Sequence, residues 1–490
     1  MVFRESSRKI AVRGMKKRSE ADRLITKIVV VVTMGALAFG YDTGVIAGAL
    51  PFMQLPVAKG GLGLTPLTEG LVTSALVLGA AFGSLICGML ADRFGRRDSL
   101  MALSAVFVVG AIGTAQAPSV AVMIAMRAIL GFAVGGASAL VPMFISEMAP
   151  SGRRGRLVSQ NEMMIVTGQL VAYTLNAGLA HFSNSPSIWR TMLMIAAVPA
   201  VLLGVGLFFV PRSPRWLASQ GRTDEARRVL ELIRSTNRQV QHEMRAIYTA
   251  VDDDAEQIGW RQALREVWIR RLLMLGVGLG FAAQFTGVNA FMYFTPIILR
   301  QTGLGTEAAL IATIGDGLVA VGATFAGIWM IGRFPRRVTL LGGLCGVVLA
   351  HLALGATLLF LKGSAIESYA ALGFILLALL FIQMMVSPLY WLLMSELFPM
   401  RARGVLTGLS VSCQWIFNAT VAFLFPIILH AIGPGTFFVF ATINVLSFCF
   451  VARFLPETKG LSLEKLEAHL QDHFSAEDQE KSSDPVALTK

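Results

Sequence analysis

The two halves of this 490-residue chain repeat the same short motifs in the same order, and this repeat constrains the fold more than any other feature. The stretch ADRFGRR at residues 91–97 returns as IGRFPRR at residues 331–337. The stretch SEMAP at residues 146–150 returns as SELFP at residues 395–399. Long apolar runs flank each copy, and repeated membrane-spanning units are common in secondary transporters. The repeat therefore predicts two related halves, each with the same succession of membrane helices.

The composition favours a membrane protein, because 55% of the residues are hydrophobic and only 15% are charged. Soluble proteins carry about a quarter charged residues. A helix needs about 20 apolar residues to cross a bilayer, and we predict twelve such spans, several of them long enough to tilt or break. The spans are expected at residues 25–50, 71–91, 99–117, 120–146, 157–181, 190–210, 271–299, 308–331, 338–361, 368–396, 404–430 and 435–455. The expected fold is an all-α integral membrane protein with twelve transmembrane helices in two six-helix halves.

The organisation expected from these spans has a basic N-terminus, two halves separated by a polar linker, and a C-terminal segment. These parts are residues 1–24, 25–210, 211–270, 271–455 and 456–490. In the linker, acids and then apolar residues at helical spacing follow Thr223 and predict a short helix against the bundle. A second such run covers residues 461–470, and the polar tail beyond it is expected to be disordered. The alternative is that both segments only solubilise the chain.

The net charge of +12 indicates orientation more than it indicates a nucleic-acid partner. Arginines gather in alternate short loops, whereas the opposite loops hold few basic residues. By the positive-inside rule, both termini and the linker lie in the cytoplasm of a cell whose plasma or inner membrane the protein spans several times. The basic N-terminus does not resemble a cleavable signal peptide. We expect contact with membrane lipid, a monomer, and no nucleic-acid partner.

No feature of the sequence favours an enzyme or an ATP-driven pump. The four cysteines lie inside apolar runs, and the six histidines are scattered singly, so no metal site is expected. No phosphate-binding loop, dinucleotide fingerprint or nucleophile motif stands in a usable context. The sequence predicts a protein without a cofactor.

Ionisable residues inside membrane spans are costly, so each one is a candidate functional group. Asp42 lies in the first span and Arg127 in the fourth. A nearby arginine stabilises an ionised carboxylate and burial stabilises the neutral acid, so a conformational change that alters their distance would load and unload a proton. The alternative is a permanent ion pair that only stabilises the bundle. Asp316, in the eighth span, is a third such acid without an obvious partner.

The acids at the cytoplasmic ends of two spans are expected to form gating salt bridges. Glu147 ends the fourth span and Glu396 ends the tenth, both beside arginines. We predict that, in the outward-open state, each acid pairs with the arginine motif of the opposite half and so closes the cytoplasmic side. The residues of this gate are Asp92, Arg93, Arg96, Arg97, Glu147, Arg333, Arg336, Arg337 and Glu396.

Uncharged polar and aromatic residues in several spans point to a neutral, polyhydroxylated substrate. Amides donate and accept hydrogen bonds, which suits vicinal hydroxyls, and aromatic rings pack on the C–H faces of sugars. The alternative is hydrogen bonding between helices, which is common in membrane bundles. The set comprises Gln169, Asn176, Gln284, Thr286, Asn289, Tyr293, Trp391, Gln414, Trp415 and Asn418.

Over nearly its full length the chain resembles the sugar porter branch of the major facilitator superfamily. The motifs that carry the resemblance are FGYDTG at 39–44, DRFGRR at 92–97, PRSPRWL at 211–217, QFTGVN at 284–289 with Tyr293, SELFP at 395–399 and PETKG at 456–460. The resemblance implies the major facilitator fold around a central cavity and transport by alternating access. It implies that Asp42 is the proton-titrating aspartate and Arg127 its partner. The implied sugar contacts are Gln169, Gln284, Asn289, Tyr293, Trp391, Gln414 and Trp415, with Phe39 as an aromatic wall.

Three positions depart from the family pattern. Ala283 replaces the first of two glutamines, so one hydrogen bond to the sugar is missing. Arg212 stands where a glutamate is usual, and Gly332 stands where the first half has Asp92. The expected function is import of a hexose, a pentose or a cyclic polyol such as myo-inositol by proton symport. The alternatives are a passive sugar facilitator and a non-transporting sugar sensor.

Overall fold

The computed structural model describes residues 2–183, 185–253, 262, 264–364, 366–399 and 402–459. Every regular element within these residues is helical. Twelve of the described helical stretches are long and apolar enough to cross a membrane, which confirms the predicted number. Contacts divide the chain into two compact units, Met1–Ala255 and Glu256–Lys490, and six of the twelve stretches belong to each. The boundary between the units lies inside the polar linker.

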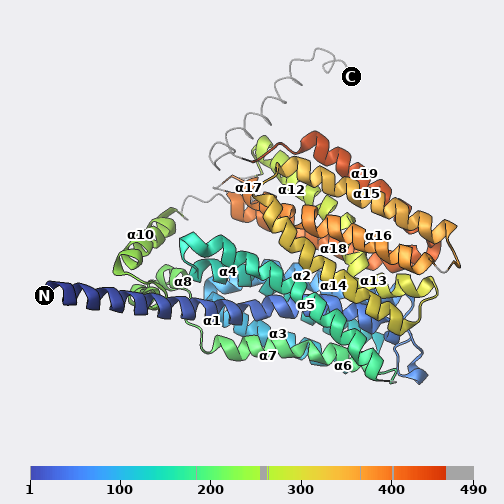
Figure 1. Ribbon diagram of the computed structural model, residues 1–490, viewed down its shortest axis with the longest axis horizontal. Helices are drawn as coiled ribbons and strands as arrows, with labels where there is room; N and C mark the ends of the chain where they lie inside the picture. Colours follow the sequence, from blue (N-terminus) through green and yellow to red (C-terminus); the bar gives the residue numbers. More distant parts are fainter. Residues whose placement is uncertain are drawn as a thin grey trace, which may run out of the picture. The chain divides into compact units, whose positions relative to one another are not determined.

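The first unit is a bundle in which α2 packs along α4, α1 packs along α5, and α3 packs on α4 and α7 (Figure 1). Its membrane helices are α1 (Val2–Met53), α2 (Pro66–Phe94), α3 (Arg96–Ala115), α4 (Val120–Met148), α5 (Arg154–Phe182), α6 (Ile188–Ile195) and α7 (Ala197–Leu207). Single 3₁₀ turns lie at Val57–Lys59 and Ser151–Arg153. The sixth span is therefore made of two short helices, α6 and α7.

Glycines allow α1 and α5 to approach each other closely. A Cβ atom on Gly40 would lie 1.8 Å from the carbonyl oxygen of Ile165, and one on Gly44 would lie 2.9 Å from that of Gln169. A larger residue at Gly40 would push the helices apart, whereas small residues let membrane helices pack backbone to backbone. The FGYDTG motif thus places Asp42 in a tight helix interface.

Three short helices follow the first bundle: α8 (Pro214–Ser219), α9 (Thr223–Ile233) and α10 (Asn237–Asp253). The helix predicted from Thr223 is confirmed as α9, which packs against α1 and α8. Asp224 and Glu225 lie in its first turn, where the helix dipole favours acids. Its buried face consists of Ala226, Val229, Leu230 and Ile233. The predicted run at 461–470 and the polar tail lie outside the described residues.

The second unit repeats this plan, with α15 packed against α16 and α19, and α12 against α18 (Figure 1). Its helices are α12 (Val267–Phe285), α13 (Val288–Gln301), α14 (Thr306–Ile331), α15 (Arg336–Phe360), α16 (Glu367–Phe381), a π-helical turn at Ile382–Val386, α17 (Ser387–Glu396), α18 (Arg403–Ile432) and α19 (Gly435–Phe454).

Two spans of the second unit are interrupted. The seventh breaks between α12 and α13 at Thr286 and Gly287, and Gly287 has a left-handed φ of 81° that favours glycine. The tenth passes through the π-helical turn before Pro388. Irregular backbone at membrane depth is tolerated where protein or a water-lined cavity satisfies its polar groups. The backbone polar groups at the break in the seventh span therefore need hydrogen-bond partners from other parts of the protein or from water.

Candidate functional site

Asp42 on α1 and Arg127 on α4 form a buried ion pair in the first unit. Nη1 of Arg127 lies 3.0 Å from Oδ1 and 3.2 Å from Oδ2 of Asp42. The two side chains expose only 2% and 0% of their surface. Nε of Arg127 also donates to the carbonyl oxygen of Val72 at 3.4 Å. The structure thus brings together the two charged residues that the sequence singled out. Removing one partner of such a pair leaves an uncompensated buried charge, which costs about 3–5 kcal/mol.

The polar residues of α5 have different surroundings. Gln169 is buried, and its backbone lies against Gly44 of α1. Asn176 donates through Nδ2 to the carbonyl oxygens of Gly44 at 3.4 Å and Val45 at 3.2 Å. Asn176 therefore joins α5 to α1 by hydrogen bonds. This contact fits the alternative explanation for the polar residues, namely hydrogen bonding between helices. Phe39 is half-buried on α1, three residues before Asp42.

In the second unit, the break of the seventh span joins two of the predicted amides. Nδ2 of Asn289, on α13, donates to Oε1 of Gln284, on α12, at 2.8 Å. Gln284 is buried and Asn289 is half-buried. The Thr286 hydroxyl donates a hydrogen bond to the carbonyl oxygen of Ala283 at 2.6 Å and so satisfies a backbone group at the end of α12. The two amides are thus joined by a hydrogen bond and lie side by side at the break.

Asn444, on α19, supports this break and was not singled out from the sequence. Its Nδ2 donates to the carbonyl oxygens of Phe285 and Phe440, both at 2.8 Å. The side chain is fully buried. Because α12 ends at Phe285, this carbonyl is among those without a helical partner. The only feature of the sequence that could have indicated this hydrogen-bonding role is the presence of an amide inside an apolar span.

A second group of polar atoms lies where α17 and α18 approach α12. A Cβ atom on Gly280 would lie 3.2 Å from Cβ of Gln414 and 3.5 Å from Oη of Tyr390, so these two side chains meet beside this glycine. Among the described residues, Oε1 of Gln414, Oη of Tyr390 and Oδ1 of Asn418 are buried without a hydrogen-bond partner. Buried polar atoms are nearly always hydrogen-bonded. The hydroxyls of a ligand would satisfy them.

The predicted aromatic residues differ in burial. Trp415 and Tyr293 are buried, whereas Trp391 is 42% exposed. The ring of Trp391 lies 5.3 Å from that of Tyr390, in an edge-to-face arrangement. Trp391 therefore presents an exposed aromatic surface beside the Tyr390 ring.

The arginine motif of the first unit pairs with the acid of the same unit. Nε of Arg96 donates to Oε1 of Glu147 at 2.9 Å, and Nη1 of Arg96 lies 3.0 Å from Oδ1 of Asp92. Nε of Arg97 lies 2.9 Å from Oδ1 of Asp98. The guanidinium of Arg93 lies over the ring of the adjacent phenylalanine. The reason for this pairing is that α2 and α4 pack side by side, so the loop after α2 meets the end of α4.

The second unit repeats this arrangement. Nη2 of Arg336 donates to Oε1 of Glu396 at 3.2 Å, and the Thr458 hydroxyl donates to Oε2 of the same acid at 2.7 Å. Arg337 bonds the Ala452 carbonyl, and Arg333 lies over the Trp329 ring, 4.1 Å from its centroid. Each acid thus pairs with the arginine motif of its own half, and pairing across the halves stays a prediction for the outward-open state.

Arg212, which stands where the family usually has a glutamate, pairs with an acid of the first unit. Its Nη2 lies 2.7 Å from Oδ2 of Asp98, the acid that also binds Arg97. Nε1 of Trp216, four residues later, donates to the carbonyl oxygen of Asp92 at 2.9 Å. The segment after the sixth span is therefore anchored to the arginine motif in spite of the missing glutamate.

Asp316 is a buried acid of α14 whose two carboxyl oxygens have no hydrogen-bond partner among the described residues. Thr295 on α13 is a neighbouring hydroxyl. Its hydroxyl donates to the Phe291 carbonyl at 2.7 Å. Asp316 is thus a buried acid without an ion-pair partner among the described residues.

The chain is similar to known transport proteins over nearly its whole length. The family model for sugar and other transporters matches residues 28–470. The putative metabolite transport protein YncC of Bacillus subtilis is 48% identical, over 94% of this chain and 99% of the relative. The major myo-inositol transporter IolT of the same organism is 45% identical, over 94% of this chain and 98% of the relative.

Solved structures of the xylose transporter XylE from E. coli have the same fold. Its inward-open conformation superposes with a TM-score of 0.79 at 29% identity, covering 91% of this chain and 99% of XylE. A second structure, of the proton:xylose symporter XylE bound to 6-bromo-6-deoxy-D-glucose, gives a TM-score of 0.75 at 30% identity, covering 92% of this chain and 99% of XylE.

Proposed function

The chain belongs to the sugar porter family of the major facilitator superfamily, a family of transporters and not of enzymes, and on that premise we propose that it imports a neutral sugar or cyclic polyol by proton symport. The candidate substrates are hexoses, pentoses and myo-inositol. The names of two relatives, one a myo-inositol transporter and one a proton:xylose symporter, support this range.

The buried pair of Asp42 and Arg127 carries the proposal of proton coupling. With the pair formed, the carboxylate is neutralised by the guanidinium at 3.0 Å. When Asp42 takes up a proton, the attraction is lost, and the helices α1 and α4 that hold the two groups become free to separate. A rearrangement that separates them favours the protonated acid in return. Proton binding and helix movement are thereby linked.

The available energy suffices for accumulation. One proton that moves inward across 100 mV supplies about 2.3 kcal/mol. At about 1.4 kcal/mol per factor of ten, this supports roughly fifty-fold accumulation of one substrate per proton.

The substrate contacts follow from the polar groups of each unit. In the second unit, Gln284 and Asn289 offer a joined pair of amides, and Gln414 offers a buried carbonyl oxygen that has no partner among the described residues. Trp391 offers an exposed aromatic face. In the first unit, Gln169 contributes from α5. Neutral donors and acceptors beside aromatic rings fit the hydroxyls and C–H faces of a sugar.

The proposed setting is the cell membrane, with both termini in the cytoplasm. Twelve apolar helices make this a multi-pass membrane protein. The orientation is inferred from the basic loops, which the positive-inside rule places in the cytoplasm. Contact with lipid follows from the many exposed apolar side chains on the helices. A monomer is the simplest functional form, because each chain holds both halves.

The test is uptake by proteoliposomes of labelled myo-inositol, D-xylose and D-glucose, with and without a proton-collapsing ionophore. We expect accumulation of at least one substrate, and its loss with the ionophore. Asp42→Asn should abolish accumulation and leave exchange of substrate across the membrane largely intact, since the substrate contacts lie elsewhere. Asp224→Asn, the same change at an exposed residue of α9, is the matched control.

Each alternative has its own result. Normal accumulation by Asp42→Asn would remove Asp42 from the coupling step. Uptake that equilibrates without ever becoming concentrative in the unaltered protein would identify a passive facilitator. Binding of a sugar without any uptake or exchange would identify a sensor. Because exchange requires a folded protein, it also reports whether Asp42→Asn tolerates the unpaired Arg127.

A further inference from the structure

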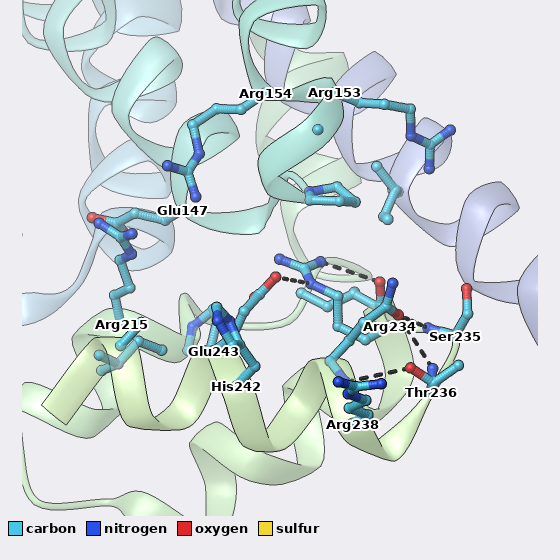
Figure 2. A pocket seen from close by; sticks show the side chains of 18 of the residues that line it. Glu147, Arg153, Arg154, Arg215, Arg234, Ser235, Thr236, Arg238, His242 and Glu243 are labelled. Carbon is cyan, nitrogen blue, oxygen red and sulfur yellow. Dashed lines mark hydrogen bonds and ion pairs between the residues drawn. The ribbon is translucent and has the colours of Figure 1, made fainter. Parts of the chain in front are cut away.

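A cavity of about 950 Å³ opens at the basic end of the first unit, and its lining includes neither Asp42 nor Arg127. It lies between the end of α4 with the start of α5 on one side and α8 with the turn before α10 on the other (Figure 2). The cavity is thus built within one unit, from membrane helices and from the helices of the linker. No residue of the proposed substrate site lines it, whereas Glu147, one of the predicted gate residues, does.

The lining carries more positive than negative charge. Eight charged side chains face the cavity, five arginines against three carboxylates, with His242 in addition. They are Arg153, Arg154, Arg215, Arg234, Arg238, Asp22, Glu147 and Glu243. Figure 2 shows that basic groups approach from both sides, with Arg153 and Arg154 facing Arg215, Arg234 and Arg238.

Arginine partners already engage all three carboxylates. Arg153 pairs with Asp22. Nε of Arg234 lies 2.7 Å from Oε1 of Glu243. The third acid, Glu147, accepts from Arg96 outside the cavity, as described above. These pairs leave the excess positive charge on the remaining arginines.

Arg154 and Arg238 make no ion pair with any described residue. Nε of Arg154 is buried and has no hydrogen-bond partner among the described residues. The guanidinium of Arg154 points into the cavity in Figure 2. Arg234 donates to the carbonyl oxygens of Met148 at 3.0 Å and Ala149 at 3.2 Å, which hold its guanidinium in place.

We propose that this cavity binds a phosphate-bearing anion with two or more negative charges. Planar guanidinium groups bind phosphate oxygens in pairs, and arginines on opposite sides require an anion that presents oxygens in several directions. The side chains of Ser235 and Thr236 add neutral hydroxyls to the lining. The volume is within the range of small-molecule sites, roughly 300–1,000 Å³. A metal cation is disfavoured because every lining carboxylate is engaged by an arginine.

Two sources offer this chemistry: a soluble phosphate ester and the headgroup of an anionic lipid. The first arm of the test uses the full-length protein in nanodiscs of phosphatidylcholine alone. Pyrophosphate and glucose 6-phosphate are titrated by calorimetry, with glucose as the neutral control. We expect saturable binding of the two anions that weakens as salt rises, because salt screens exposed charge.

Charge-removing variants locate the binding. Arg154→Gln and Arg238→Gln should each weaken the binding by about tenfold or more, the effect of losing one charge-assisted contact. Arg228→Gln is the matched control, because Arg228 is exposed on α9 and does not line the cavity. The thermal midpoint of each variant shows whether it is folded.

The second arm replaces part of the phosphatidylcholine with phosphatidic acid. A headgroup in the cavity would weaken pyrophosphate binding, and Arg154→Gln would lower retention of phosphatidic acid in native mass spectrometry. Binding of pyrophosphate that this lipid does not affect would identify a soluble ligand. The proposal is overturned if neither source binds, or if Arg228→Gln lowers the affinity as much as Arg154→Gln does.

Discussion

The substitution Gln284→Ala tests the substrate site of the second unit most directly. Gln284 is buried at the end of α12, and its Oε1 accepts a hydrogen bond from Asn289 at 2.8 Å. Ala283 already stands in place of another family glutamine, so this position has no second amide to replace a lost contact. We expect Gln284→Ala to abolish detectable sugar binding while the protein still folds and reaches the membrane.

The magnitude follows from the contacts that would be lost. The substitution leaves a substrate hydroxyl without a partner, which costs about 1–3 kcal/mol. At about 1.4 kcal/mol per factor of ten, the affinity falls roughly five- to a hundredfold. Asn289 loses its acceptor as well, and because it is half-buried, water replaces only part of that contact. The expected effect therefore lies at the upper end of this range.

The assay is calorimetry on purified protein with the sugar that the uptake experiment selects. Gln301→Ala, at the exposed end of α13, is the matched control and should bind normally. Because Gln284 and Asn289 share a hydrogen bond, their alanine variants should be non-additive by about 0.5–3 kcal/mol in a double-mutant cycle. Near-normal sugar affinity in a folded Gln284→Ala would refute the reasoning and remove the seventh span from the binding site.

Three further predictions concern single groups. Tyr390→Phe removes a buried hydroxyl that has no partner among the described residues, and we expect weaker sugar binding in calorimetry with an unchanged or raised thermal midpoint; unchanged affinity would place the hydroxyl outside the site. In double-mutant cycles of thermal stability, Glu147→Gln should couple to Arg96→Gln, and absence of this coupling would refute the pair within the first half. Asp316→Asn should leave accumulation intact, because Asp316 makes no ion pair with any described residue; loss of accumulation with retained exchange would make Asp316 a coupling residue.

The repeat and the apolar runs were sufficient to predict the helical architecture. The order of the motifs predicted two related halves. The lengths of the apolar runs predicted twelve spans, and the structure confirms this number. The short helix from Thr223 was predictable as well, because its acids and apolar spacing act locally. Exact interruptions were not predictable, since Gly287 looks like any glycine in an apolar run until its left-handed φ is known.

The polar contacts show where sequence reasoning stops. Asp42 and Arg127 could be matched because each is conspicuous in a membrane span. The pair of Glu147 with Arg96 of its own half was not predicted, since the repeat offers two arginine motifs of nearly identical sequence and only the packing of α2 along α4 reveals this contact. Tyr390 was not singled out from the sequence, and its position beside Gln414 makes its hydroxyl a candidate substrate contact.

The pairs within each half differ from the predicted latch across the halves in what a conformational change does to them. Arg96 with Glu147 and Arg336 with Glu396 each join helices of one unit, and Glu457 accepts from the backbone N–H groups at the start of α15. Such contacts can persist while two repeats move as rigid bodies. A latch across the halves would instead have to break and re-form in each cycle, and its formation would bias one state. The easier place for internal change is the break at Gly287, where the helical hydrogen bonds are already interrupted and where Gln284 and Asn289 meet. A substrate that bonds both amides would draw α12 and α13 together at that point, so binding and helix geometry are coupled through the same two side chains.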